Sequence, residues 1–421
     1  MLVQELARVQ PKKCDMKRIW TTRLFAVTLI VGIFATSLGW GGGRGNWSWA
    51  HKAEGASLYP VDAAALEEEL RWLEASQTGQ GALAQNPEQK DVVPYFANLA
   101  AMALVRDNPG LVQRYMDWYL ARLNRPDRFG RYGTIYDYRI EPDGHEVPTY
   151  DYDSADSYAA TLLSLASWYV RATGDIRWAQ QHHDQLQDVA EVIVRLQDGD
   201  GLVWAKPGLG VKLLMDNSEN YRGLVDWSWL LNQMGHGGEA ATYRRRADWI
   251  WQGIETQLWN PWRGMYEWGL GGVHLPSLGP RWYPDSVSQL YPIVYGVIDP
   301  KSDRARLLYA KVMARFPRWA EGDTGDPFPW AIAAYAAVLV GDTNSAQVYL
   351  NHSAQHWPPK AQRGPWYAAE SGYLIRTVEL MNQIAVKKAP AAPAPAATPA
   401  APAPVAAPTV SSPETRQILG S

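Results

Sequence analysis

Apolar and polar positions alternate along residues 61–385 in two kinds of helical segment. Segments of the first kind are charged and carry a single apolar stripe. In residues 175–197, for example, four apolar side chains recur at helical spacing with mostly polar and charged residues between them: Leu186, Val189, Ile193 and Leu196. Such a stripe is typical of a helix that covers a core from outside. The pattern predicts outer helices at 62–77, 110–124, 175–197, 238–258, 302–316 and 343–356.

Segments of the second kind are apolar or small on nearly every side, which predicts helices in the interior of the protein. Each has an Asp or Glu near its start, an aromatic residue within about one helical turn, and a largely apolar body. The six segments begin at Asp91, Tyr152, Met215, Tyr283, Asp326 and Trp366. Their spacing is too irregular for a tetratricopeptide or ankyrin array.

Six outer segments that alternate with six inner ones predict an all-α fold, an (α/α)6 toroid of six helical hairpins. Inner helices run parallel in such a ring, so their acidic N-terminal ends should meet on one rim. The alternative is an open helical solenoid, which should show near-constant repeats and polar capping ends. The sequence shows neither feature.

The long connections all precede inner helices and should lie on that same rim. They span residues 129–154, 198–219 and 258–286, and their aromatic stretches and Gly turns predict short β-hairpins or ordered loops. Turns such as 173–175 and 341–343 suggest a plain opposite rim. Because long loops in compact domains are usually functional, the elaborated rim is expected to be the working face.

Both ends of the chain differ from this central domain. A basic segment (1–23) precedes an apolar run (24–40), which predicts a signal sequence or a membrane anchor, followed by a Gly/Trp-rich linker (41–60). We therefore expect export to the periplasm or cell exterior, with contact to the membrane if the segment is not cleaved. Residues 386–421 form an Ala/Pro-rich tail, expected to be an extended spacer. The only cysteine, Cys14, lies in the basic segment, so no disulfide is expected.

Composition narrows the possible partners. The formal net charge is −3, so no basic field indicates nucleic-acid binding. Trp (21) and Tyr (22) far outnumber Phe (6), although core packing alone has no reason to prefer rings with a polar edge. Such rings suit half-wet surfaces such as sugar-binding grooves. We therefore expect this protein to be a monomer and its partner to be a polysaccharide.

Three motifs at the starts of inner segments carry a resemblance to a known group of enzymes. They are Asp91-Val-Val-Pro-Tyr95, Asp153-Ser-Ala-Asp156 and Tyr283-Pro-Asp285-Ser286. With the alternating helices, they resemble the six-hairpin glycosidase superfamily, and at motif level the family-8 glycoside hydrolases. The first motif has Asp where that family has Glu, the second has one extra residue between its acids, and the third has an inserted proline. The resemblance implies hydrolysis of a polysaccharide with inversion.

The chemistry of glycoside hydrolysis points to the same rim. It needs two carboxyl groups flanking the scissile bond, one of them protonated at the working pH. Acids crowded on an aromatic rim acquire raised pKa values through desolvation and like-charge repulsion. The candidate catalytic residues are Asp91, Asp156, Glu219 and Asp285.

Three of these acids have a structural alternative as helix caps. Asp91 and Asp285 each stand where an N-cap could lie. Asp216 followed three residues later by Glu219 resembles a capping box. In the second inner segment, Asp153 or Ser154 is expected as the N-cap and Asp156 lies in the first turn, where the capping explanation is weakest.

Further side chains near the acids are expected to bind substrate. They are Tyr95, Asp153, Tyr221, Arg222, Trp282, Tyr283, Trp330, Trp366 and Glu370. Glu370 could instead pair with Arg376 or Lys360. No cofactor or metal is expected: His352 and His356 have metal-ligand spacing, but we interpret them as a solvated pair on an outer helix.

Two other functions remain open. A polysaccharide lyase would need a Tyr or His base and a cation that neutralises a uronate, which Tyr221-Arg222 or Arg281-Trp282-Tyr283 could supply. Few cations lie close to the rim acids, however, and only Lys90 and Arg222 stand within three positions of one. This balance favours a neutral or aminated polysaccharide. The chain could also be a non-catalytic glycan-binding component of an envelope or polysaccharide-secretion assembly.

Overall fold

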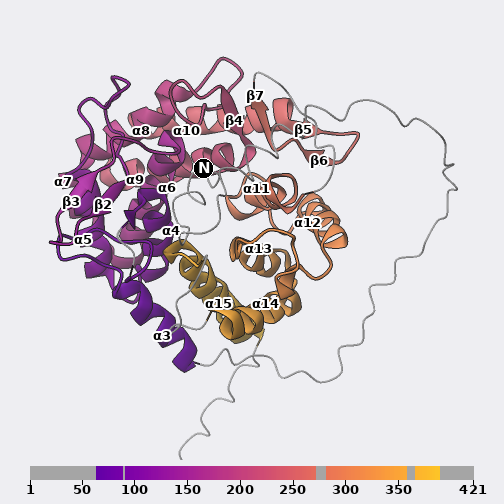
Figure 1. The fold of residues 1–421 in the computed structure, drawn as a ribbon. Helices are drawn as coiled ribbons and strands as arrows, with labels where there is room; N and C mark the ends of the chain where they lie inside the picture. Colours follow the sequence, from indigo (N-terminus) through magenta and orange to yellow (C-terminus); the bar gives the residue numbers. More distant parts are fainter. Residues whose placement is uncertain (1–62, 89–90, 272–280, 358–365, 389–421) are drawn as a thin grey trace, which may run out of the picture.

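The computed structural model describes residues 63–88, 91–271, 281–357 and 366–388 (Figure 1). The expected basic segment, apolar segment and linker lie outside the described residues, as does the tail from residue 389 onward. Within the described part of the chain, no helix is both long enough and apolar enough to span a membrane.

The inner helices form a closed ring. They are α4 (Pro94–Leu104), α6 (Ala155–Thr173), α9 (Leu214–Met234), α11 (Tyr291–Val294), α13 (Ile332–Val340) and α15 (Ala368–Lys388). Each contacts the next one in chain order, and α15 returns to contact α4 (Figure 1). This closure confirms the predicted toroid and excludes the open solenoid.

A second layer of helices surrounds the ring. It consists of α3 (Ala63–Glu74), α5 (Pro109–Leu120), α7 (Ile176–Gln181), α8 (His183–Leu196), α10 (Gly237–Gly253), α12 (Asp303–Arg315) and α14 (Thr343–His356). The predicted stripe of α8 is buried, whereas every residue of the inner helix α4 is buried. The two apolar patterns therefore separate outer from inner helices as predicted.

Prolines interrupt two of the predicted inner helices. The fourth inner segment is a π-helix η2 (Trp282–Ser286), a 3-10 helix η3 (Val287–Leu290) and only then α11. Pro284 and Pro292 lack the backbone N–H that a continuous α-helix requires, and Tyr283 is non-helical. The fifth segment becomes helical only at Ile332, after two further prolines at 327 and 329.

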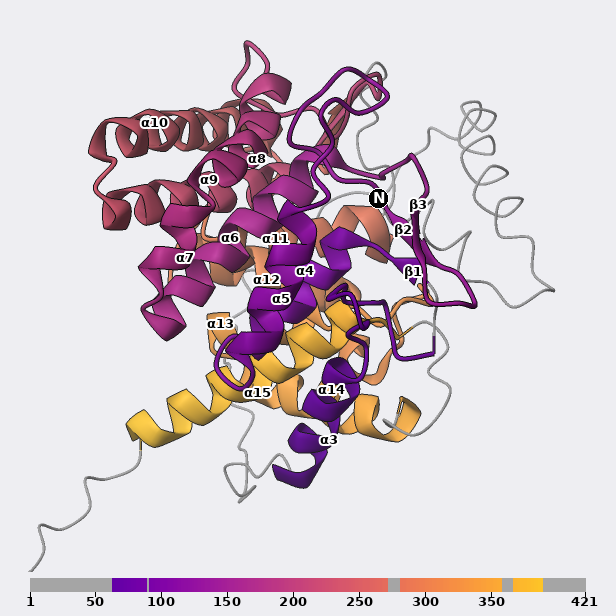
Figure 2. The same cartoon turned by 90° about the vertical axis from the view of Figure 1, so that its left-hand side faces the viewer.

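Short β-strands lie at one end of the ring, as the sequences of the long loops predict. Strands β1 (Asp91–Val92), β2 (Tyr138–Ile140) and β3 (Glu146–Pro148) form an antiparallel sheet. Strand β4 (Val211–Leu213) pairs with β7 (Gly269–Gly271), and β5 (Trp259–Asn260) follows the π-helix η1 (Ile254–Leu258) and pairs with β6 (Met265–Tyr266). Strands β1 and β4 lead directly into α4 and α9, and Figure 2 shows β1, β2 and β3 gathered at one side of the ring.

Glycines allow the inner helices to approach closely. A Cβ on Gly223 of α9 would lie 2.7 Å from both Cα and the carbonyl oxygen of Ala160 in α6. A Cβ on Gly372 of α15 would lie 2.6 Å from the carbonyl oxygen of Leu99 in α4. Because backbone atoms cannot yield as a flexible side chain can, only glycine fits where the last inner helix meets the first.

Replacing Gly372 by alanine is therefore expected to destabilise the protein by about 1–3 kcal/mol through overpacking. Gly238→Ala in the outer helix α10 is the matched control, because its added Cβ meets nothing within 4 Å. Urea unfolding of both variants measures the difference. Equal stability of the two would contradict tight closure between α15 and α4.

Candidate active site

Glu219 lies where the N-terminal halves of several inner helices meet. It is in the second turn of α9 and only 1% exposed. Its Oε1 accepts hydrogen bonds from the hydroxyls of Tyr95 of α4 (2.6 Å) and Tyr295, which follows α11 (3.0 Å). The Tyr295 hydroxyl lies 2.8 Å from that of Tyr373 of α15. One carboxyl group thus connects four inner helices at the centre of the ring.

The surroundings of Glu219 keep this carboxyl protonated at neutral pH. Burial, followed by the negative charge of Asp216 one turn earlier, raises its pKa from 4.5 to about 8, although the hydroxyls of Tyr95, Ser157 and Tyr295 partly offset the rise. Its second oxygen, Oε2, is buried and has no hydrogen-bond partner among the described residues. Glu219 is therefore a carboxylic acid that keeps its proton at neutral pH, and its Oε2 is available for a further hydrogen bond.

A second group of polar side chains joins α6 to α9 beside Glu219. Ser154 is the N-cap of α6, as expected, and its hydroxyl lies 2.5 Å from Oδ1 of Asp156. Asp156 also accepts from the backbone N–H of Ser157 (2.8 Å) and from the side-chain amide of Asn220 (2.7 Å). Both oxygens of Asp156 are used within the protein. This favours a role for Asp156 in positioning α9.

Asp216 accepts fewer hydrogen bonds from the described side chains than Asp156 does. Its Oδ2 lies 3.4 Å from the Ser154 hydroxyl, and Oδ1 is buried without a partner among the described residues. Burial raises the pKa of Asp216 to about 6, and both burial and Asp216 raise that of Asp156. Asp216 is a functional candidate that the sequence analysis treated only as a cap.

The capping explanations for Glu219 and Asp91 are wrong. The N-cap of α9 is Leu213, which places Asp216 inside the first turn, and its carboxylate contacts α6. The carboxyl of Glu219 accepts from tyrosines and not from a helix start. Val93 occupies the N-cap position of α4, because β1 continues to Val92 and ends just before the helix.

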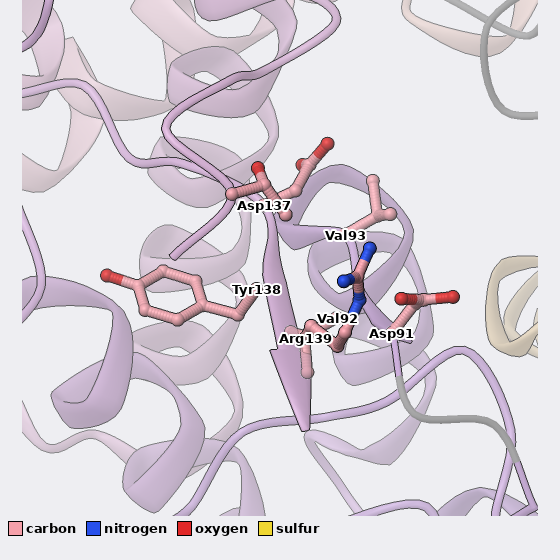
Figure 3. A pocket seen from close by; sticks show the side chains of 7 residues that line it. Asp91, Val92, Val93, Asp137, Tyr138 and Arg139 are labelled. Carbon is pink, nitrogen blue, oxygen red and sulfur yellow. The ribbon is translucent and has the colours of Figure 1, made fainter. Parts of the chain in front are cut away.

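Asp91 lies on the rim sheet. It is paired with Arg139 across β1 and β2. Together with Asp137 and Thr149, these residues line a cavity of about 120 Å³ (Figure 3). Asp137 in turn accepts a hydrogen bond from the hydroxyl of Tyr158 of α6 (2.8 Å). Asp91 is thus placed in a rim cavity that is separate from the hydrogen bonds around Glu219.

Asp285 lies in the η2 segment and is buried. Its Oδ2 accepts from the guanidinium Nε (3.0 Å) and the backbone N–H (3.3 Å) of Arg281. Its Oδ1 is buried without a hydrogen-bond partner among the described residues. The negative charge of Asp216 contributes to a raised pKa of Tyr283 after burial, which indicates that η2 approaches the start of α9.

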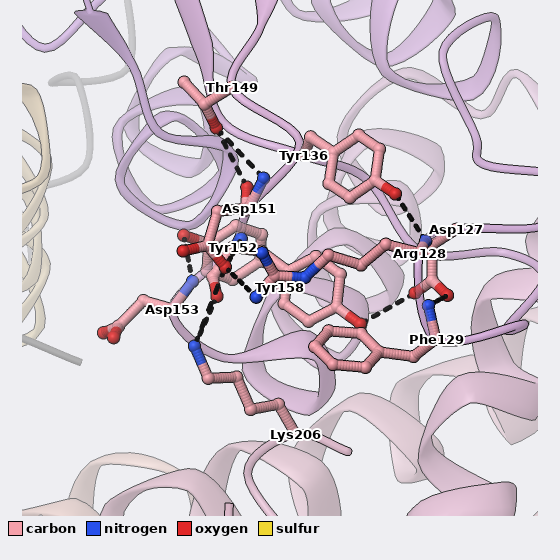
Figure 4. Close-up of polar contacts among 10 residues, drawn as sticks. All are labelled: Asp127, Arg128, Phe129, Tyr136, Thr149, Asp151, Tyr152, Asp153, Tyr158 and Lys206. Carbon is pink, nitrogen blue, oxygen red and sulfur yellow. Dashed lines mark hydrogen bonds and ion pairs between the residues drawn. The ribbon is translucent and has the colours of Figure 1, made fainter. Parts of the chain in front are cut away.

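Hydrogen bonds hold the loop that leads into α6 (Figure 4). The hydroxyl of Tyr152 donates to Asp127 (2.7 Å), and Arg128 forms an ion pair with Asp151 (2.9 Å). Lys206 donates to the carbonyl oxygen of Tyr152 (2.8 Å), while the N–H of Asp153 faces the hydroxyl of Tyr158 (3.4 Å). The predicted substrate residue Asp153 therefore lies on a loop with a defined backbone.

Glu370 stabilises the start of a neighbouring helix. Its Oε2 accepts from the backbone N–H of Ala331, the N-cap residue of α13, at 2.5 Å. Burial raises the pKa of Glu370 to about 7. The expected pairing with Arg376 is not formed, because that guanidinium lies against the rings of Trp168, Tyr335 and Tyr373. Lys360, the other proposed partner, lies outside the described residues.

The tryptophans expected to stack on sugar are buried. Trp282 packs against Phe316 and stacks on Trp319, so its ring belongs to the core. Trp366 is 1% exposed and donates to the hydroxyl of Ser371 (2.8 Å). The indole N–H of Trp282 is buried without a hydrogen-bond partner among the described residues. Composition cannot distinguish such buried rings from rings on a sugar-binding surface.

Trp330 carries backbone strain directly before α13. Its φ is +60°, in the left-handed region, which costs a non-glycine residue on the order of 1–3 kcal/mol. Its indole N–H donates to Asp326 (3.1 Å), and its ring stacks on Tyr283, with centroids 5.4 Å apart. The strained residue thus holds Tyr283 beside the rim acids.

Tyr221 and Arg222 lie farther along α9. Tyr221 is half-buried and packs against the core. Arg222 binds Asp226 through two hydrogen bonds (2.7 and 2.5 Å) on the same helix. Tyr295 and Tyr373, which contact the Glu219 group, were not predicted, and only their place in acid-led inner segments could have indicated them.

Comparisons with known proteins identify the fold. No protein-family model and no curated protein matches the sequence. A solved glycosidase matches 75% of this chain and 96% of its own at 14% identity, with a TM-score of 0.56. A rhamnosidase from Klebsiella oxytoca with rhamnose bound matches 79% of this chain and 66% of its own, at 14% identity and a TM-score of 0.54. A GH78 rhamnosidase of Bacillus sp. GL1 matches 75% and 35%, at 13% identity and a TM-score of 0.51.

At these low sequence identities, the likeness shows only that this chain shares the helical fold of these glycosidases. The family-8 likeness of the motifs stays a prediction. The site residues are therefore judged by their own geometry.

The raised pKa of Glu219 predicts a specific dependence of stability on pH. Its folded-state pKa of about 8 exceeds the ordinary 4.5, so the folded protein binds a proton that the unfolded chain releases between these values. The free energy of unfolding should therefore fall as pH rises through this window. Glu219→Gln should flatten this fall, measured by urea unfolding on both sides of the window.

Part of the slope should remain in this variant. Asp216 and Glu370 have pKa values raised to about 6 and about 7, and they contribute with the same sign. An identical pH dependence in the wild type and Glu219→Gln would show that Glu219 is not protonated in the folded protein.

Proposed function

We propose that this chain is a glycoside hydrolase whose general acid is Glu219. The observation that carries the proposal is the buried carboxyl at the centre of the ring, with a pKa of about 8 and one oxygen without a partner among the described residues. A general acid must hold its proton at the working pH and release it to the leaving oxygen. The fold shared with glycosidases supports this assignment.

The general base in this proposal is Asp285. Arg281 engages Oδ2 and fixes the orientation of the carboxylate, while Oδ1 has no partner among the described residues and could accept a proton from water. Asp216 then has a different task, because its charge helps to keep Glu219 protonated. Asp156 takes no part in proton transfer in this proposal, because its three hydrogen bonds occupy both of its oxygens.

The reaction would proceed by direct displacement. Glu219 protonates the glycosidic oxygen while Asp285 removes a proton from a water molecule that attacks the opposite face of the sugar. The configuration at the anomeric carbon is inverted, as the resemblance to family-8 enzymes implies. Tyr95, which donates to Glu219, helps to stabilise the carboxylate that remains after proton transfer.

The substrate in this proposal is a neutral or aminated polysaccharide outside the cytoplasm. Three cations near the rim acids are already neutralised: Arg222 pairs with Asp226, Arg281 with Asp285, and Lys212 with Asp198 and Asp200. A lyase needs a cation that faces the substrate carboxylate, and these three pairings leave none of them in that position. Lys90 lies outside the described residues. The export signal expected at residues 24–40 supports the location.

Glu219→Gln is expected to lower kcat by about 10²–10⁴-fold, the usual contribution of a general acid. Asp285→Asn should cause a comparable loss, and wild-type activity should decline as pH rises through about 8, where Glu219 loses its proton. The control is Glu191→Gln on outer helix α8, whose carboxylate also accepts from a tyrosine hydroxyl (Tyr243, 3.0 Å). Rates of release of reducing ends measure all three variants.

Retained turnover in both Glu219→Gln and Asp285→Asn would falsify the hydrolase assignment. If instead the wild type binds glycan without cleaving it, the chain is a binding module of an envelope or secretion assembly. Glycan affinity of the inactive variants, measured by titration, separates loss of chemistry from loss of binding.

Digestion of a panel of polysaccharides distinguishes hydrolysis from elimination. We expect new reducing ends from a β-glucan or a glucosamine polymer, and no product with the ultraviolet absorbance of an unsaturated uronate. Unsaturated products from a uronate polymer would assign a lyase and overturn the proposed roles of the two acids.

A further inference from the structure

Three potential metal ligands meet at the outer layer, far from the rim acids. They are His183, the first residue of α8, His236, the N-cap residue of α10, and Glu239 in the first turn of α10. One ligand atom from each lies within 4.8 Å of the others. Helix α9 continues for 15 residues after Glu219, from 219 to 234, before the turn to His236, which places the group about 22 Å away at about 1.5 Å per helical residue.

The contacts of His183 direct one of its ring nitrogens at Glu239. Its Nδ1 lies 3.1 Å from the carboxylate of Asp184, which can only accept a hydrogen bond, so the ring proton belongs on Nδ1. In the neutral imidazole, Nε2 then presents a lone pair. That atom faces Oε2 of Glu239 at 3.3 Å, and neither atom has a hydrogen-bond partner in the part of the chain that the structure describes. A positive charge between these two atoms, either a proton or a metal ion, would satisfy both of them.

We propose that His183, His236 and Glu239 bind a divalent transition-metal ion of the Zn²⁺ class. Zinc binds His nitrogen and carboxylate oxygen at about 2.0–2.2 Å, so a tetrahedral ion separates two of its ligand atoms by about 3.3–3.6 Å. The separation between Nε2 of His183 and Oε2 of Glu239 matches this value. Asp184 has the position of an outer carboxylate that orients a ligating histidine.

The remaining ligand atoms lie within 4.8 Å of one another and would move closer together around a bound ion. Nδ1 of His236 lies 2.9 Å from Oε1 of Glu239, and the rings of His183 and His236 stack with centroids 4.5 Å apart. Binding of the metal displaces the proton that His236 shares with Glu239, because a ligating imidazole nitrogen must be deprotonated. Three protein ligands leave the fourth position to water.

The site would fasten the turn between α9 and α10 to α8. Gly235, in the left-handed conformation at φ +89°, ends α9 and directs the chain to His236. A metal held by both helices would therefore restrain the α9–α10 hairpin from the rim opposite the acids. Its expected effect is on stability.

The test uses the untagged full-length protein after treatment with a chelator. Titration with Zn²⁺ alone should show one equivalent bound and a raised melting temperature, and Co²⁺ should give the visible spectrum of a four-coordinate ion. Glu239→Gln and His236→Gln should each weaken Zn²⁺ binding by more than about tenfold, since even the loss of an outer-shell partner costs about 10–100-fold. Asp184→Asn should fall in that outer-shell range.

His352→Gln is the matched control. His352 and His356 stack on α14 with centroids 3.9 Å apart, but among the described residues they belong to no group of three potential metal ligands, and this variant should bind Zn²⁺ like the wild type. Circular dichroism verifies that each variant is folded, and the isosteric Glu239→Gln decides the outcome if His236→Gln does not fold. Absence of Zn²⁺ binding, or binding unchanged in Glu239→Gln, overturns the proposal and leaves a protonated His–Glu ion pair.

Discussion

A buried carboxyl bonded to two tyrosines is the constraint on which the centre of this ring depends. Glu219 lies among α4, α9, α11 and α15, and its hydrogen bonds reach the hydroxyls of Tyr95 and Tyr295. A charged group in this position would be costly to bury, so the protein keeps it neutral over the physiological pH range. The same burial raises the pKa of this carboxyl group to about 8, as the proposed role of general acid requires.

The other rim acids show how the N-terminal ends of parallel helices are held together. Parallel helices direct their positive ends to the same place, which repels them from one another and attracts negative side chains. Asp156 joins α6 to α9, and Glu370 joins α15 to the start of α13. Acid-led inner helices are therefore partly a structural requirement of the toroid, independent of any reaction.

Much of the fold could be predicted because inner and outer helices differ in hydrophobic pattern along their whole length. The predictions from the sequence were wrong where a single proline or a single contact determined the local structure. Pro284 and Pro292 divided the fourth inner segment, and Asp216 was mistaken for a cap because its partner, Ser154, is distant in sequence. Carboxyl pKa values depend on burial by other helices. A sequence motif therefore locates the acids on the rim but does not indicate which of them has the most strongly raised pKa.

The contact that closes the ring also orders the events of folding. Gly372 of α15 must meet Leu99 of α4, and these two residues lie at opposite ends of the domain sequence. A chain that emerges from the ribosome in order can stack its early hairpins but must leave one flank of α4 uncovered until the final hairpin arrives. Contacts between such distant residues form slowly and leave apolar surface exposed meanwhile. A toroid of this kind is therefore most prone to aggregation for as long as its last helix is missing.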